Sequence, residues 1–332
     1  TQLWSYEGSS ANTVIRAKFI LMPELTITTI PGSGEDHSGV VKESETEEIY
    51  RISTPDGLVY AAKNLFAQKK DGVYNIAADL DMTGKNYEAP KIDNVAGNFT
   101  LNGNGKTISN LGNRLIAETG SAKTVTIKDL TLDKASIKIE VTSTTEEIPN
   151  AEAGVAAFIG YAGTSENIVL ENCHLVNSSI EAINSSWIGG LIGYAAGFNQ
   201  ANNGPVFETV KITNCSVKGS TLTGGGSSVG SVIGHGIGDA ATLVLIDKVE
   251  VSGNTISGNK DQKLGSVFGT VGSKVDPTAW NGQANGVHLD NSSTTIEKNT
   301  VNNKVVSGLD KLYGRNFCNL WIDGSLQNAP NL

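Results

Sequence analysis

Positive charge is scarce in this sequence of 332 residues. Lysine and arginine together number 25 against 34 aspartates and glutamates, so the formal net charge is -9 at pH 7. Nucleic acids are held by clustered basic side chains that neutralise phosphates. The composition therefore excludes a nucleic acid as the expected partner.

Long apolar runs are also absent. No stretch of roughly 18 apolar residues is present to cross a membrane, and no charged region followed by an apolar region opens the sequence. We therefore expect no transmembrane segment in this chain. We expect an exported protein, extracellular or on the outer cell surface, whose signal is not present in this chain.

Metal-binding residue types are few. The three cysteines, Cys173, Cys215 and Cys318, have neither the spacing of a disulfide framework nor that of a zinc site. The histidines show no ligand spacing either. We expect no metal and no cofactor.

Glycine, by contrast, is abundant. The chain contains 38 glycines, only 18% of its residues are charged, and asparagine, serine and threonine are common. This composition suits many short strands that are joined by tight polar turns. It predicts an all-β chain with little helix.

An eleven-residue phrase recurs five times, with apolar residues at its first, sixth and last positions. The copies are Ile127 to Ile137, Leu170 to Ile180, Ile212 to Leu222, Ile246 to Ile256 and Ile296 to Val306. Repeats of this kind form solenoids, in which each unit buries its apolar face against its neighbours. Equivalent side chains should then lie in columns, about 4.8 Å from one level to the next.

The phrase contains a step that a regular strand does not allow. Leu170 and Cys173 are both apolar but three residues apart, so the chain must bend near Asn172. Asn214 holds the same place one repeat later. Asparagine tolerates a left-handed backbone, and its amide can bond to the next copy. We expect an asparagine ladder at a corner.

Two cysteines share one position of the phrase. Cys173 and Cys215 stand where Leu130 and Val249 stand in other copies. Because free cysteine behaves as a small apolar residue, we predict that both are buried free thiols. The alternative is a disulfide between successive levels.

A second phrase alternates with the first and ends in glycine. Its copies are Val155 to Gly160, Ile188 to Gly193, Val229 to Gly234, Leu264 to Gly269 and Leu309 to Gly314. Insertions between copies should form loops on one side, where a ligand surface is most expected. The last two residues before each glycine are apolar, so both faces of this sheet should be covered. Loops, the N-terminal strands or another subunit could cover it, which makes an oligomer through this apolar face possible.

One helix is predicted, over residues 55–68. Thr54 can cap it, Pro55 suits its first position, and Asp56 lies at the positive end of the helix dipole. Leu58 and the apolar residues that follow at helical spacing form one stripe. We expect this helix to cap the first repeat.

The chain divides into two parts. Residues 1–50 lack the repeat, and they form a small N-terminal β segment with strands at Val14–Ile20 and Leu25–Ile30 and an acidic linker. Residues 51–332 form the solenoid with its capping helix. The last copy, with Asp310-Lys311 in place of small residues, should be the terminal rung.

The second phrase resembles the GLUG repeat, which is named for a Gly-Leu-x-Gly core. The closest copy is Gly189-Gly190-Leu191-Ile192-Gly193-Tyr194, and Val169 to Cys173 is similar to the companion segment. The resemblance covers about residues 50 to 320. It implies a right-handed parallel β-helix, secreted or on the surface of Bacteroides-like bacteria, often in adhesins. The family supplies no catalytic residues to transfer.

An enzyme of the β-helix type, a polysaccharide lyase or hydrolase, is the alternative function. Gly234-His235-Gly236 resembles a polygalacturonase segment, but the companion acidic and basic segments are missing. Asp79 and Asp81 could hold calcium or make corner hydrogen bonds, and the absence of a third nearby acid favours the second. We predict that the chain is not an enzyme and has no catalytic residues.

Exposed aromatic side chains are the candidate ligand-binding residues. Tyr161, Trp187, Tyr194, Phe198 and Trp280 lie on or beside the predicted insertion loops. Aromatic rings stack on the faces of sugars, although many of these rings should only cover the sheet. We expect a cell-adhesion or binding protein that recognises a glycan or a surface protein.

Overall fold

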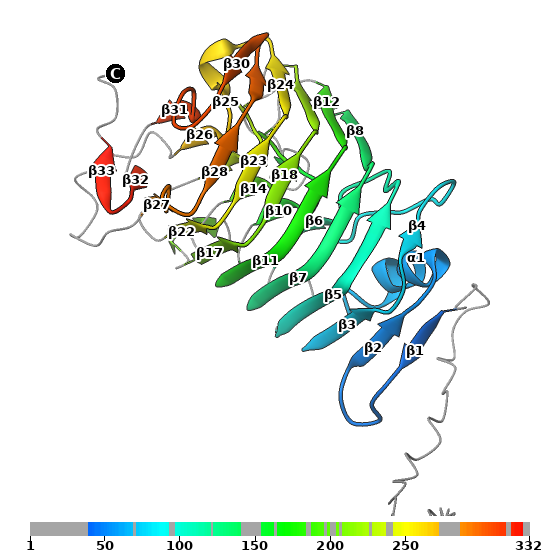
Figure 1. The fold of residues 1–332 in the computed structure, drawn as a ribbon. Helices are drawn as coiled ribbons and strands as arrows, with labels where there is room; N and C mark the ends of the chain where they lie inside the picture. The colour runs from blue at the N-terminus through cyan, green and yellow to red at the C-terminus, as the bar shows by residue number, and fades with distance from the viewer. Residues whose placement is uncertain are drawn as a thin grey trace, which may run out of the picture.

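The computed structural model describes most of the chain from Gly39 onward (Figure 1). The described residues are 39–68, 71–92, 97–120, 122–140, 154–162, 165–183, 187–195, 198–199, 204–205, 208–225, 228–236, 242–271, 286–316 and 320–327. The strands predicted at Val14–Ile20 and Leu25–Ile30 lie outside these ranges, as do Cys318 and Trp280.

Strands dominate the described residues, which contain one α-helix. Most neighbouring strands pair in parallel, in four sheets. From β7 to β26 the chain passes through these sheets in a constant order, sheet 1, sheet 3, sheet 4 and then sheet 2, before it returns to sheet 1 one level further along. We call one such passage a rung. Figure 1 shows the rungs side by side, from blue to red.

Sheet 1 has 15 strands in the described part of the chain. They are β1 (Val40–Lys42), β2 (Ile49–Ile52), β3 (Gly72–Ile76), β4 (Leu80–Asp81), β5 (Asn98–Ser109), β7 (Thr124–Asp133), β11 (Asn167–Val176), β17 (Glu208–Thr213), β18 (Ser216–Lys218), β22 (Thr242–Asp247), β23 (Glu250–Ser252), β27 (Gly286–Leu289), β28 (Thr295–Glu297), β32 (Leu320–Ile322) and β33 (Ser325–Gln327). Antiparallel pairs, β1 with β2 and β32 with β33, lie at its two ends.

The other three sheets are shorter. Sheet 2 holds β6 (Ile116–Glu118), β10 (Ile159–Ala162), β14 (Ile192–Ala195), β21 (Ile233–Gly236), β26 (Phe268–Val271) and β31 (Tyr313–Asn316). Sheet 3 holds β8 (Ser136–Glu140), β12 (Ser179–Ile183), β19 (Thr221–Gly224), β24 (Thr255–Gly258), β29 (Asn299–Val301) and β30 (Lys304–Val306). Sheet 4 holds β9 (Gly154–Val155), β13 (Trp187–Gly189), β20 (Ser228–Gly230) and β25 (Leu264–Gly265). A separate hairpin joins β15 (Phe198–Asn199) to β16 (Gly204–Pro205), and a 3₁₀ turn, η1, spans Asp261–Lys263.

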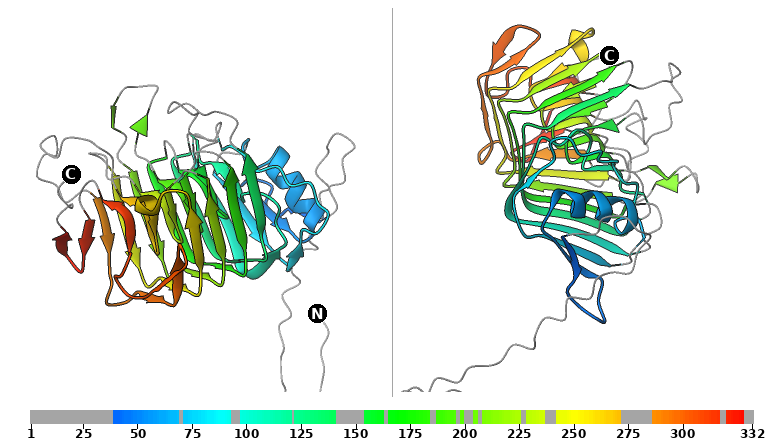
Figure 2. Two further views of the ribbon diagram at one scale, coloured as in Figure 1. Left: turned by 90° about the horizontal axis from the view of Figure 1, so that it is seen from above. Right: turned by 90° about the vertical axis from the view of Figure 1, so that its right-hand side faces the viewer.

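The predicted helix forms as α1 (Pro55–Asn64) and packs at the N-terminal end of the rungs (Figure 2). The Thr54 hydroxyl accepts a hydrogen bond from the Gly57 amide at 3.0 Å, as expected of a capping residue. The helix ends one turn earlier than predicted. Leu65 and Phe66 turn into the core instead, where the Phe66 ring lies 4.5 Å from Tyr74 and 5.2 Å from Phe99.

The predicted corner ladder is confirmed. Asn172 and Asn214 have φ values of 52° and 53°, in the left-handed region. The Asn214 amide donates to the side-chain oxygen of Asn172 at 3.1 Å, and the Asn172 amide donates to Asp129 at 2.9 Å. These two rungs therefore turn at this corner through a side chain that also bonds to the neighbouring rung.

The predicted column of buried side chains is also confirmed. Cys173 pairs with Leu130, and the Cys173 amide donates to the Cys215 sulfur at 3.4 Å. The Glu250 amide donates to the Cys215 carbonyl, which places Val249 next in the column. Cys173 and Cys215 are buried and free, so the disulfide alternative is wrong. Burial raises the pKa of the Cys173 thiol, which keeps it protonated.

The fifth copy of the first phrase was placed out of register. In the structure Leu289 pairs with Ile246, and Ile296 pairs with Val251, the sixth residue of the preceding copy. The true copy therefore runs from Leu289 to Val301, with two extra residues before Ile296. Because the apolar positions are five residues apart, a shift of five leaves the pattern matched.

The glycine-rich segment Asn102 to Gly105 does not form the turn that its composition suggests. It lies inside the single strand β5, where the register to β7 shifts between Asn102 and Lys106. Asn104 and Gly105 have φ values of 52° and 70°, as in a β-bulge. The segment keeps its parallel neighbours because the extra residues bulge out of the strand.

Sheet 2 is covered on both faces within the chain. All residues of β10 and β26 are buried, because the core lies on one side and sheet 4 on the other. A Cβ atom at Gly193 would lie 2.4 Å from the Val155 amide nitrogen of sheet 4. The described residues leave no apolar face of this sheet open for an oligomer, and their strongly exposed large apolar side chains, Val305, Leu309 and Leu326, lie at the C-terminal end.

Candidate functional site

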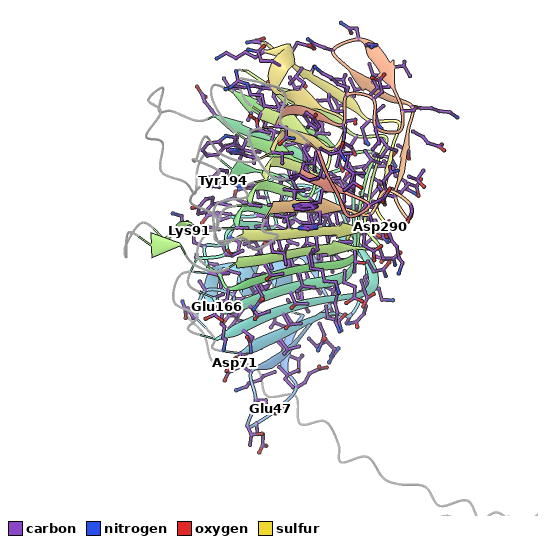
Figure 3. The ribbon with its side chains drawn as sticks, turned by 90° about the vertical axis from the view of Figure 1, so that its left-hand side faces the viewer. Glu47, Asp71, Lys91, Glu166, Tyr194 and Asp290 are labelled. Atoms are coloured by element: carbon purple, nitrogen blue, oxygen red, sulfur yellow. The ribbon has the colours of Figure 1, made fainter. Side chains whose placement is uncertain are left out.

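Three of the predicted ligand-binding residues come together at the junction of sheets 2 and 4. Tyr161, Trp187 and Tyr194 lie there with His235, and we call these four residues the aromatic edge. The Tyr161 and Tyr194 rings are 5.2 Å apart and nearly parallel, at 11°. The Trp187 ring lies 4.3 Å from Tyr194 and 5.6 Å from His235. Figure 3 shows Tyr194 on the same side of the molecule as Lys91 and Glu166, away from Asp290.

The repeat itself builds this edge. Tyr161, Tyr194 and His235 each follow the closing glycine of the second phrase, and they pair in register in β10, β14 and β21. The same column begins at Glu118 and continues through Thr270 to Arg315. A side chain of this column therefore recurs at every rung, at the strand ends where the insertions begin.

Trp187 joins the column because the two sheets approach each other unusually closely. The chain folds back between Gly189 and Gly193, and a Cβ atom at Gly189 would lie 1.9 Å from the Ile192 carbonyl oxygen. Only glycine permits backbones to pack at that distance. This contact brings the side chains of β13 and β14 to the same edge, seven residues apart in the sequence.

The aromatic edge is only partly open. Tyr161 is buried at 3% exposure, whereas Trp187, Tyr194 and His235 are partly exposed. Tyr194 lies between Tyr161 and Trp187, so its ring faces are occupied by other rings. The edge therefore offers a ligand the partly exposed ring of Trp187, together with its indole N–H group.

Burial lowers the pKa of His235 to about 3, and the positive charge of Lys263 contributes in the same direction. The ring is partly exposed at the surface, but enough protein surrounds it to disfavour the charged form. At neutral pH this histidine is an uncharged aromatic member of the edge.

Replacing His235 with tyrosine should make stability less sensitive to acid. Below pH 6.5 the unfolded histidine binds a proton that the folded ring resists down to about pH 3, so the native protein loses stability across this window. We expect His235→Tyr, which matches Tyr161 and Tyr194, to lose roughly 1–2 kcal/mol less between pH 7.5 and pH 4.5. Urea unfolding at both pH values measures this, and equal losses in the two proteins would contradict it.

The other two predicted ligand-binding residues, Phe198 and Trp280, cannot be assigned to the aromatic edge from the described atoms. Phe198 lies in β15, but its side chain is outside the described atoms, and Trp280 is outside the described residues. His235, which was not among the predicted ligand-binding residues, lies against Trp187 and Tyr194. The signal for this role was its register with the two tyrosines.

A groove on sheet 3 was not predicted. Its volume is 540 Å³, and it extends across β12, β19, β24 and the tip of the β29–β30 hairpin. The residues that line it are Glu181, Ala182, Ile183, Thr223, Gly224, Gly225, Ser257, Gly258, Asn259 and Asn302. No single segment of the sequence carries a signal for it, because the lining residues come from four rungs.

A polar network lies on the outer face of sheet 1. The His174 ring nitrogens are 2.9 Å from the Ser216 hydroxyl and 3.0 Å from the Asn172 side-chain oxygen. A serine bonded to a histidine is the arrangement that activates a nucleophile. Here Ser216 is only 5% exposed, so a substrate has little access to its oxygen, and the network supports the corner ladder.

The two aspartates considered for calcium make corner hydrogen bonds. Asp79 accepts from the Thr107 amide at 2.8 Å, and Asp81 accepts from the Asn110 amide at 2.8 Å and from Thr83. These bonds lower the pKa of Asp81. Among the residues that the structure describes, no cluster of three or more acidic, histidine or cysteine side chains is suited to a metal, and the metal-free state stays a prediction.

Comparisons with known proteins give little support for a family. No protein-family model matches the chain, so the GLUG resemblance gains no support from one, and no curated protein matches it. The structure is similar to the crystal structure of a putative immunoglobulin A1 protease from Bacteroides ovatus. That match has 12% sequence identity and a TM-score of 0.40, over 87% of this chain and 81% of the other.

This comparison overturns one prediction. The chain was predicted not to be an enzyme, and the similar structure belongs to a protein described as a protease. The prediction of no enzymatic activity is therefore withdrawn, although at this similarity no residue role is transferred.

Within the described residues, no helix has the length and apolar character needed to span a membrane.

Proposed function

We propose that this protein is an exported cell-surface binding protein that recognises a glycan through the aromatic edge. The observation that carries the proposal is the meeting of four rings from three successive rungs at the strand ends, with Trp187 and Tyr194 partly exposed. Aromatic side chains give a large apolar surface beside polar groups, which suits the mixed faces of a sugar ring.

The proposed scaffold is a right-handed parallel β-helix with α1 as its N-terminal cap. Apart from the hairpins β1–β2, β29–β30 and β32–β33, neighbouring strands of these sheets are parallel. They are joined by crossovers through the other sheets, and such crossovers are right-handed in about 98% of cases. The division into an N-terminal β segment with an acidic linker, residues 1–50, and a β-helix, residues 51–332, remains part of the proposal. The β1–β2 hairpin spans that boundary and pairs with the first rung.

The proposal predicts that Trp187→Ala weakens glycan binding at least tenfold. Removal of the indole takes away a partly exposed ring surface of the edge and its N–H donor. A glycan array with the whole chain identifies the probe, and titration of the best hit measures the loss. Trp321→Ala is the matched control, because Trp321 is a partly exposed tryptophan that stacks on His288 in sheet 1, away from the edge.

Two results would contradict the proposal. One is an array without hits, and the other is equal affinity in Trp187→Ala and the native protein. Reducing-sugar and unsaturated-uronate assays on any hit then show whether a bound glycan is also cleaved. Turnover of the glycan would favour a lyase or hydrolase over a binding protein.

A further inference from the structure

The sheet 3 groove is lined mainly by polar side chains. Glu181, Thr223 and Ser257 share one outward-facing column, and Asn302 follows at the next level. Gly225, which is exposed and also lines the groove, has no side chain. Four successive rungs contribute, so the groove extends roughly 14 Å along the stack.

The walls present neutral hydrogen-bonding groups. The Thr223 and Ser257 hydroxyls are 3.1 Å apart, and each retains further donor or acceptor capacity. The Asn259 amide nitrogen donates to the Gly225 carbonyl at 2.7 Å, which orients the side-chain oxygen of Asn259. The Glu181 carboxylate is paired with Lys138 at 3.2 Å, so the groove carries little unbalanced charge.

The position of the groove argues against a peptide that would add to a sheet edge. Such peptides bind through unpaired backbone groups, but β19 is paired on both sides, to β12 and to β24. A ligand here must be recognised by side-chain hydroxyls and amides that repeat at each rung. A chain of hydroxyl-bearing rings meets that requirement, because each ring offers donors and acceptors at a regular repeat.

We propose that the sheet 3 groove binds a neutral, extended oligosaccharide that lies along the stack axis. The inference rests on the proposed function only in taking a glycan as the ligand class. It adds a second site, built by β12, β19 and β24, that does not use the rings of the aromatic edge.

Thr223→Trp tests this site, because an indole at the centre of the outward column would fill the groove. Thr221→Trp is the matched control: Thr221 is exposed on the same strand and the same face, but it does not line the groove. Native gel electrophoresis in soluble α-glucan, β-glucan and mannan measures retardation, with polygalacturonate as the anionic comparison. We expect at least one neutral polysaccharide to retard the native protein, a tenfold or greater loss in Thr223→Trp, and no change in Thr221→Trp.

Retardation by none of the neutral polymers, stronger retardation by polygalacturonate, or unchanged binding in folded Thr223→Trp would each overturn the groove. If Thr223→Trp does not fold, Ser257→Ala and Asn259→Ala take its place, each with an expected loss of at least threefold. Trp187→Ala is run beside them. Loss in Trp187→Ala alone supports the aromatic edge and rejects the groove, whereas loss in Thr223→Trp alone supports the groove and rejects the edge as the site for that ligand.

Discussion

Gly234→Ala is expected to destabilise the protein by about 3 kcal/mol or more. A Cβ atom at Gly234 would lie 2.4 Å from the Ile188 amide nitrogen and 2.6 Å from the Gly193 carbonyl oxygen. Both are backbone atoms of paired strands, so neither can move away as a flexible side chain would. Sheets 2 and 4 would have to separate along this rung. Urea unfolding followed by circular dichroism measures the change.

Gly236→Ala is the matched control for that substitution. Gly236 is buried two residues later in the same strand, but a Cβ atom there would meet Ile233 and Val287 at 3.6 Å, an ordinary contact. We expect a change within about 0.5 kcal/mol, or a slight stabilisation from the stiffer unfolded chain. Equal effects of the two substitutions would show that the close approach of sheets 2 and 4 is not the reason why glycine ends each copy of the second phrase.

The second large effect is expected at Asn254, which lies in a buried polar ladder inside the corner between sheets 1 and 3. Its side-chain oxygen accepts from the Ser220 amide at 2.9 Å, and its amide donates to the Val217 carbonyl at 2.7 Å and to Asn299 at 3.0 Å. Asn254 is 1% exposed and Asn299 is 0% exposed. Leucine at position 254 would leave these partners buried without bonds, and we expect a loss of about 3–5 kcal/mol.

Asn254→Ser supplies the graded comparison. In the preceding rung the Ser220 hydroxyl accepts from the Ser178 amide and donates to the Lys218 carbonyl, both at 3.1 Å. Serine at 254 can repeat this pattern, so we expect it to cost about 1 kcal/mol. Thermal unfolding should rank the native protein first, Asn254→Ser second and Asn254→Leu last. A leucine variant as stable as the serine variant would show that the ladder contributes little.

The corner and core columns were predictable from the sequence because the repeat maps directly onto strand register. Leu130, Cys173 and Cys215 occupy one position of the phrase, and parallel in-register pairing places them on top of one another. Asn172 was predicted to bend the chain because two apolar residues three apart cannot share a face without a bend. These inferences need only local chemistry and the assumption of stacking.

The strand register predicted from the sequence was wrong where the apolar pattern was ambiguous. Ile296 matched two positions of the phrase, because apolar residues five apart look the same after a shift of five. Pairing with Val251 resolves the ambiguity, and that pairing depends on the path of the chain through the preceding loop. The glycine-rich segment at Asn102 was also ambiguous, because glycine and asparagine suit both a turn and a bulge.

The candidate sites divide in the same way. Tyr161 and Tyr194 could be placed in one column from the phrase alone, but the approach of Trp187 depends on the backbone contact between sheets 2 and 4. The residues that line the sheet 3 groove come from four rungs, so no single segment carries a signal for it.

By itself, the sequence determined a chain of short strands in stacked repeats, with asparagine corners, buried thiols and a helix at the start. Spacing and residue type are sufficient for those features, because each repeat can bury its apolar positions only against the next. The tertiary structure alone decided which strands pair at the C-terminal end, which faces are covered, and where the groove lies. These depend on how closely sheets approach one another and on which side chains meet across them, and neither is a property of one segment.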